Sequence, residues 1–192
     1  MTSKFLAKVL IVIGLTINAS YALGKQIPMW ENVSKTPAML KADKAFVDNI
    51  HKQTNGKIKK ASFRAIQLGW KFVSKNNPDM AIRRFNQAWL LEPKNPNIHW
   101  GFAVATHLQN APLSTVERHF RKAEKLKKNN AALFADHGRI LEQRGKSKKA
   151  IKYFKKALAI KPNLKDALIG MVRASRSLGD TATANNYRKK LK

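Results

Sequence analysis

A catalytic or metal site in this chain would be built from its histidines and acidic residues. Their spacing predicts neither kind of site. No H-E-x-x-H motif occurs and the sequence has no cysteine, so it contains no zinc-type ligand pattern. It also has no glycine-rich phosphate loop and no G-x-S-x-G motif. We therefore expect no enzyme and no cofactor or metal. The five histidines are His51, His99, His107, His119 and His137.

Basic side chains are in large excess. The chain has 38 Lys and Arg against 11 Asp and Glu, for a formal net charge of +27. Rows of such charge attract lipid headgroups, acidic polysaccharide or nucleic acid without reading a base sequence. The same rows also serve as solvated helix faces, and both interpretations stay open. The residues that could form a basic ridge are Arg118, Arg121, Lys122, Lys125, Lys148, Lys149, Lys152, Lys155 and Lys156.

One spaced pattern of small and aromatic residues occurs twice, 69 residues apart. Positions separated by four and then three residues share one stripe of a helix, and the proline that follows stops the helix. A weaker copy lies between the two. The chain is therefore predicted to be an array of helical repeats. The copies are Ala81, Phe85, Ala88 and Pro93, then Val116, Phe120, Ala123 and Lys128, then Ala150, Phe154, Ala157 and Pro162.

The residues before each strong copy extend the match. They read Ala65-x-x-Leu68-Gly69-x-x-Phe72 and Phe134-x-x-His137-Gly138-x-x-Leu141. The combined pattern resembles the tetratricopeptide repeat, and the chain resembles an exported bacterial member of that family. This resemblance implies an all-α fold, a right-handed superhelical array of antiparallel helix pairs forming an α-solenoid of about 3.5 repeats plus an N-terminal capping helix.

Repeat boundaries follow from the same register. We expect repeats at 62–95, 96–130 and 131–164, and a partial fourth repeat or C-terminal cap at 165–192. The second repeat is divergent and needs one extra residue near Gln109 to Pro112, which predicts a longer turn between its helices. A polar last helix suits the end of an array, since nothing stacks on it.

Two segments precede the repeats. Residues 23–36 lack helical periodicity and are expected to form an extended lead-in, whose Trp30 either docks on the body or stays exposed. Residues 37–61 are expected to form a capping helix and turn. Thr36 is its predicted N-cap, Pro37 its first helical residue and Asn55-Gly56 the turn that follows.

The first 22 residues have the pattern of a signal peptide. Lys4 and Lys8 precede the apolar run 9–17, and Ser20-Tyr21-Ala22 is a small-x-small cleavage site. We expect cleavage after Ala22 and a periplasmic or secreted protein; an uncleaved anchor is the alternative. No cysteine follows the site, so the chain is not expected to be a lipoprotein.

The resemblance also implies a binding surface. In such arrays the first helices of successive repeats line a concave groove. When the groove positions are transferred to this chain, they hold aromatic residues at one end of the array and arginines at the other. Both types are enriched at interface hot spots. The alternatives are that the tryptophans belong to the core and that the arginines pair with Asp136, Glu142 and Asp166. The predicted groove residues are Phe63, Trp70, Trp100, His107, Arg139, Arg173 and Arg176.

These observations favour a non-enzymatic scaffold that binds a protein or peptide in the groove. The alternative is a basic envelope protein that binds anionic polymers through its Lys- and Arg-rich outer surface.

Overall fold

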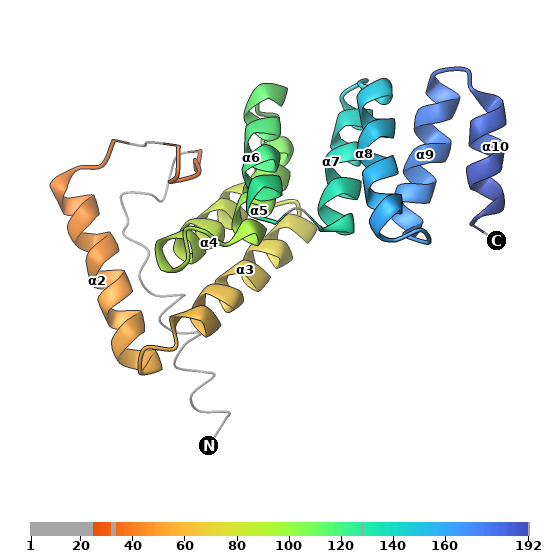
Figure 1. The fold of residues 1–192 in the computed structure, drawn as a ribbon. Helices are drawn as coiled ribbons and strands as arrows, with labels where there is room; N and C mark the ends of the chain where they lie inside the picture. The colour runs from red at the N-terminus through yellow and green to blue at the C-terminus, as the bar shows by residue number, and fades with distance from the viewer. Residues whose placement is uncertain (1–24, 32–33, 128, 192) are drawn as a thin grey trace. The chain divides into compact units, whose positions relative to one another are not determined.

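The structure is a computed structural model that describes residues 25–31, 34–127 and 129–191. The predicted signal peptide, 1–22, lies outside these residues. Every regular element in the described part is an α-helix, which confirms the predicted fold class (Figure 1). None of these helices is both long and apolar enough to cross a bilayer. The helices are α2 (Pro37–Thr54), α3 (Ile58–Ser74), α4 (Pro78–Leu91), α5 (Pro96–Leu108), α6 (Leu113–Leu126), α7 (Ala131–Gln143), α8 (Ser147–Ile160), α9 (Lys165–Ser177) and α10 (Thr181–Lys189).

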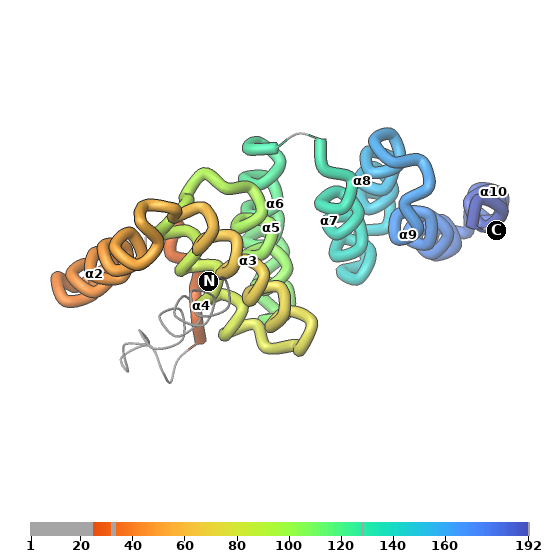
Figure 2. Tube along the Cα trace, turned by 90° about the horizontal axis from the view of Figure 1, so that it is seen from below, coloured from red at the N-terminus to blue at the C-terminus, as the bar shows by residue number. Residues whose placement is uncertain are grey.

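The described residues form two compact units that divide between Ala111 and Pro112, here called the N-terminal and C-terminal units. In the N-terminal unit α4 packs between α3 and α5, and α2 lies at one edge. In the C-terminal unit α8 packs between α7 and α9, and α10 follows α9 (Figure 2). Each unit therefore contains one second helix of a repeat enclosed by two first helices.

Asparagine and proline set the helix starts. Asn77, Asn95 and Asn130 each accept a backbone N–H from the first turn of the helix that follows. Thr36 caps α2 in the same way and Pro37 is its first residue, as the sequence predicts. Because a short polar cap satisfies an N–H that the helix itself cannot, these boundaries are local properties of the sequence.

The turns within the repeats share one geometry. Each contains a left-handed residue, Asn76, Asn110, Gly145 or Gly179, with φ of 51°, 58°, 71° and 76°. The residue after it donates its N–H to a carbonyl in the last turn of the preceding helix. The second repeat has a four-residue connection, 109–112, where the first and third have three, 75–77 and 144–146. The predicted longer turn is confirmed, and Pro112 is the residue added after the common motif.

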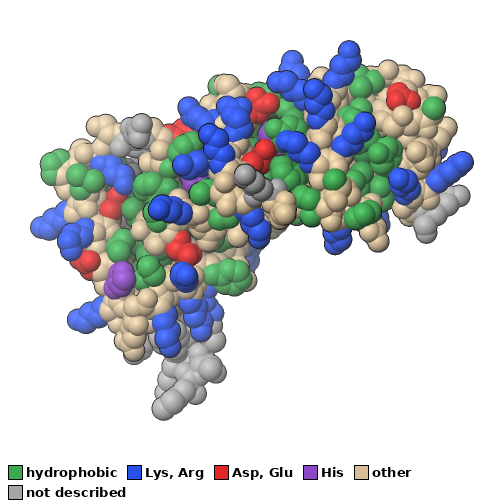
Figure 3. All heavy atoms as spheres, viewed as in Figure 1, with side chains coloured by type: hydrophobic (Ala, Val, Ile, Leu, Met, Phe, Trp, Pro, Cys, Tyr) green, Lys and Arg blue, Asp and Glu red, His purple; other side chains and the backbone are tan. Residues whose placement is uncertain are grey.

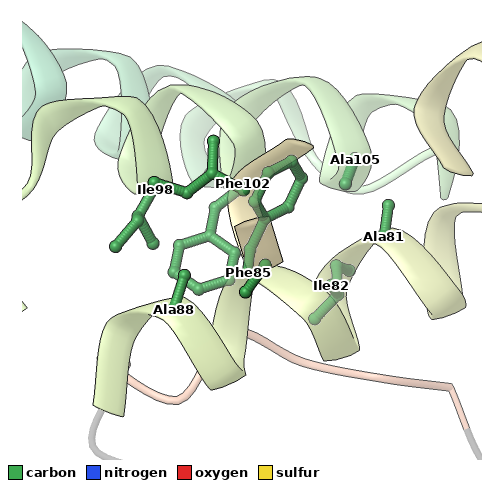
Figure 4. Close-up of a cluster of buried hydrophobic side chains, with 9 residues drawn as sticks. Ala81, Ile82, Phe85, Ala88, Ile98, Phe102 and Ala105 are labelled. Carbon is green, nitrogen blue, oxygen red and sulfur yellow. The ribbon is translucent and has the colours of Figure 1, made fainter. Parts of the chain in front are cut away.

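Phe85 is the centre of the N-terminal core. Its ring is fully buried among side chains of α3, α4 and α5 (Figure 4). The ring fits because both flanking helices have a glycine where it packs. A Cβ added at Gly69 would come within 2.5 Å of the ring, and one added at Gly101 within 2.3 Å. Burying a ring of this size contributes about 1.5–3 kcal/mol. The ring therefore fills the space where two first helices and one second helix meet.

The C-terminal unit repeats this arrangement with Phe154. Its ring is fully buried, and a Cβ at Gly138 or Gly170 would come within 2.7 Å or 2.2 Å of it. All three positions, glycine, phenylalanine and glycine, recur at the same 69-residue offset. Gly101 and Gly170 are thus both buried against a phenylalanine ring.

Candidate functional site

Trp70 and Trp100 meet on the neighbouring first helices α3 and α5. Their ring centroids are 4.9 Å apart at 65°, and both side chains are half-buried. Trp70 also meets the buried ring of Phe85 edge-on, with centroids 5.7 Å apart. The pair is therefore supported from behind by the core while part of each indole stays accessible.

Two further predicted groove residues lie along the same helices. Phe63 is seven residues before Trp70 on α3, and His107 is seven residues after Trp100 on α5, so each shares a helical stripe with its tryptophan. Phe63 is 58% exposed, the largest exposure among the large hydrophobic residues of the described segments, whereas His107 is half-buried. We call these four residues, Phe63, Trp70, Trp100 and His107, the aromatic face.

The predicted arginines lie in the C-terminal unit, and two of them are paired. Arg139 donates through Nε and Nη2 to Asp136 on the same helix, at 3.1 and 2.7 Å. Arg173 on α9 donates to Glu142 on α7 at 2.7 Å. Arg176 is exposed. Much of the positive charge expected at this end of the groove is thus offset by neighbouring carboxylates.

The nine residues of the predicted basic ridge are all exposed, on α6 and α8. Glu117 on α6 lies 3.9 Å from Arg121 on its own helix and 3.8 Å from Lys149 on α8, which brings the two basic rows together. Figure 3 shows that Lys and Arg side chains are spread over much of the face in view, in both units. Lys156 lies over the Tyr153 and Phe134 rings, at 4.7 and 5.4 Å from their centroids.

A buried polar cluster around His137 lies under this surface. His137 is 1% exposed and its Nδ1 lies 2.8 Å from Oε1 of Glu124 on α6. Its ring stacks on Phe120, with centroids 4.2 Å apart and planes at 5°, and lies 3.8 Å from the ring of Tyr153. The sequence predicts a buried histidine here, because His137 occupies a position where the resemblance expects a core leucine; the structure adds Glu124 as its partner.

The surroundings of Tyr153 shift the pKa of its hydroxyl. Burial raises the pKa of its hydroxyl to about 12; Glu124 and Glu117 add to the shift, and Arg121 opposes it. The cluster ties α6 to α7 and α8 and shields His137 from solvent. Within the described residues no group of three or more metal-ligating side chains comes together.

The lead-in packs against α4 and α5 of the N-terminal unit. Of the two alternatives for Trp30, docking on the body is therefore the one observed. This indole is half-buried and meets the ring of His99 on α5 edge-on, with centroids 5.1 Å apart. The adjoining backbone is hydrogen-bonded to side chains of α4 and to Gln109, which follows α5. These contacts lie on α4 and on a stripe of α5 different from the one that carries Trp100.

Comparison with known proteins supports the fold. Residues 131–164, which span α7 and α8, match the family model of the tetratricopeptide repeat. The match confirms the resemblance seen in the sequence. No curated protein matches the chain. Solenoids of this class bind through extended surfaces, so the fold supports a protein–protein interaction scaffold in general.

Three solved structures illustrate the likeness. A structure described as the functional characterization of Pseudomonas aeruginosa PilF has a TM-score of 0.65 and 21% identity, covering 70% of this chain and 62% of that one. MamA has a TM-score of 0.58 and 19% identity, covering 82% and 94%. The Arabidopsis OM64 TPR domain has a TM-score of 0.55 and 22% identity, covering 62% and 98%. This chain spans less than two thirds of the PilF structure. At these identities the likeness shows the fold alone.

Proposed function

We propose that this chain, which carries a tetratricopeptide repeat at residues 131–164, is a non-enzymatic scaffold that binds a protein or peptide segment in a groove at the aromatic face. The observation that carries the proposal is the contact between Trp70 and Trp100, 4.9 Å between centroids, with an exposed Phe63 two turns earlier on α3. A soluble protein gains nothing in stability from a phenylalanine ring held largely in water.

The chemistry of the face suits an apolar or aromatic anchor. Tryptophan offers a large rigid surface at low entropic cost, and binding would desolvate Phe63 and the accessible edges of both indoles. The core behind Trp70 holds that ring in place before the ligand arrives, which reduces the ordering cost of binding. In the C-terminal unit Arg139 and Arg173 would bind acidic residues of a ligand in place of Asp136 and Glu142, and the exposed Arg176 would bind them directly.

The test is a selection of peptide ligands from a random library on the full chain, followed by affinity measurements on variants. Phe63→Ala and Trp100→Ala are each expected to weaken the selected peptides at least tenfold, the loss typical of a hot-spot residue. Leu40→Ala is the matched control, because Leu40 is a 55% exposed apolar residue on α2 of the same unit, and it should change affinity less than twofold. Equal affinity for wild type and both aromatic variants would refute the groove assignment.

A second candidate function rests on the junction at Glu117. Because α6 and α8 present their basic rows on either side of this carboxylate, the ridge forms one continuous positive surface in the C-terminal unit. Such a surface would bind anionic polymers, including lipid headgroups, polysaccharide or nucleic acid, through counterion release.

Salt dependence distinguishes this second function from the first. Binding to heparin is expected to fall steeply between 50 and 200 mM salt, by roughly 10³-fold if about six charges are engaged. Reversal of Lys148, Lys152 and Lys155 to Glu should abolish it. Reversal of the exposed Lys41, Lys52 and Lys59 in the N-terminal unit changes the net charge equally and should leave most of it. Equal losses in the two triple variants would mean that net charge, and not the ridge, is responsible.

The proposed place of action is the periplasm or the cell exterior, based on the signal-peptide pattern in 1–22. Intact-mass measurement of the protein isolated from its native cells should give a chain that begins at Leu23. A chain that retains residues 1–22 would instead favour an uncleaved N-terminal anchor.

A further inference from the structure

Residues 26–29 of the lead-in are held through their main chain. The N–H of Gln26 donates to Oδ1 of Asp79 at 2.8 Å, and the N–H of Met29 donates to Oδ1 of Asn86 at 2.8 Å. Nδ2 of Asn86 in turn donates to the carbonyl oxygen of Ile27 at 3.0 Å. One side-chain amide thus grips the chain on both its donor and its acceptor side.

Gln109 completes the contact from the end of α5. Its Nε2 donates to the carbonyl oxygen of Gln26 at 2.9 Å and to Oδ1 of Asp79 at 2.8 Å. Three side chains, Asp79, Asn86 and Gln109, therefore satisfy four main-chain groups of a four-residue segment. Bonds to main-chain groups do not depend on the sequence of the bound segment, and they supply affinity in recognised modes of peptide binding.

Side chains of the segment add selectivity. Pro28 is buried and Trp30 lies edge-on to His99, whereas Ile27, just before the proline, is 50% exposed. Two features of the segment are thus read by the protein, a proline and an aromatic ring two residues later. The side chain before the proline, Ile27, is largely in solvent and is free to vary, whereas Met29 between the proline and the ring is half-buried.

Asn86 shows that the face is built to hold a main chain. It is 8% exposed, and both polar groups of its amide are used by the segment. A buried amide is costly unless its hydrogen bonds are made, so this residue is placed to hold a main chain and not for packing within α4. Asn86, Asp79 and His99 take no part in the aromatic face, which makes this a separate site.

We propose that this face, formed by Asp79, Asn86, His99 and Gln109, is a second peptide-binding site that residues 26–31 fill in cis. It takes a segment of a partner protein that carries proline followed two residues later by an aromatic residue, in a turn like the one that the N–H of Glu31 closes by donating to the carbonyl oxygen of Pro28 at 3.2 Å. The tethered segment competes at an effective concentration in the millimolar range, so it weakens the apparent affinity of any partner until it is released. The lead-in therefore regulates the site by occupying it.

Two kinds of variant of the full chain, with opposite expected effects, test the proposal. The probe is a fluorescently labelled synthetic peptide of residues 25–31. Trp30→Ala weakens the cis segment and leaves the receptor intact, so it should raise the affinity for the probe at least tenfold over wild type. Adding Asn86→Ala removes the receptor and should lower that affinity at least tenfold. Asn49→Ala, a half-buried amide on α2, is the matched control and should have no effect in the Trp30→Ala background.

Met29→Pro provides an independent way to release the segment, because it deletes the N–H that Asn86 accepts while leaving every receptor residue in place. It should also raise probe affinity, and circular dichroism on each variant confirms that the helices persist. A probe lacking both Pro28 and Trp30 should not bind. The proposal is overturned if neither released variant binds the probe more tightly than wild type, or if Asn86→Ala leaves probe binding unchanged; the segment is then only a structural strap.

Discussion

Phe85 of α4 lies so close to Gly101 of α5 that a Cβ added at position 101 would come within 2.3 Å of ring atom Cζ. Phe154 and Gly170 repeat the relationship 69 residues later, at 2.2 Å. No real Cβ tolerates such a distance, so each phenylalanine requires a glycine on the first helix of the next repeat. This contact couples successive repeats within each unit.

Gly101→Ala should therefore destabilise the N-terminal unit. Overpacking a filled core costs about 1–3 kcal/mol, which exceeds the gain of up to about 1 kcal/mol that alanine brings to an exposed helix interior. Phe85→Leu in the same chain should recover part of the loss, because it removes the ring that the new methyl group meets. Urea unfolding of the two single variants and the double variant measures this coupling. Strictly additive changes would show that the ring and the glycine do not interact.

Glu124→Ala should weaken the C-terminal unit through His137. Loss of the carboxylate leaves Nδ1 of a 1% exposed histidine without its partner, at a cost of about 1–3 kcal/mol. His137→Leu removes the group that needs the partner, so Glu124→Ala should cost much less in that background. Thermal unfolding of the four proteins gives the interaction energy, and a value near zero would contradict the role assigned to this pair.

Tyr153 should make stability depend on pH in the alkaline range. Burial raises the pKa of its hydroxyl from 10.0 to about 12, so between these values the unfolded chain ionises while the folded chain does not. The contribution of Tyr153 is complete below pH 10 and is lost as the pH rises through 12. The difference in unfolding free energy between wild type and Tyr153→Phe should therefore change across pH 10 to 12 and stay constant from pH 7 to 9. Subtracting the variant removes the titration of the lysines, which both proteins share.

Glu142→Gln should have little effect on folding and a larger effect on recognition. The pair with Arg173 is at the surface, with the arginine side chain 49% exposed, so its contribution to stability is about 0–1 kcal/mol. Freed from this carboxylate, Arg173 should bind acidic peptides more tightly at low salt. Asp166→Asn removes the same charge from an exposed site in the same unit and serves as the control. If both variants raise the affinity equally, only net charge matters.

Local chemistry explains which predictions from the sequence succeeded. The Thr36 cap, the proline at the first position of α2 and the extra residue at 109–112 act within a few residues of themselves, so a pattern in the sequence was enough to locate them. Trp70 and Trp100 were assigned to neighbouring helices from the repeat register, and the structure brings their rings into contact. Whether a ligand uses that surface stays a prediction.

The sequence by itself determined the repeat: its period, its helix pairs, and the aromatic and small residues that recur at 69-residue spacing. Only the tertiary structure showed that Gly101 and Gly170 receive a phenylalanine ring, that Arg173 pairs with Glu142, and that Asn86 holds the main chain of the lead-in. The partners in these contacts are 16, 31 and 59 residues apart. Helical periodicity relates residues three or four positions apart, whereas contacts between helices depend on how whole helices pack. A pattern in the sequence therefore predicts contacts between helices only where the repeat itself dictates them.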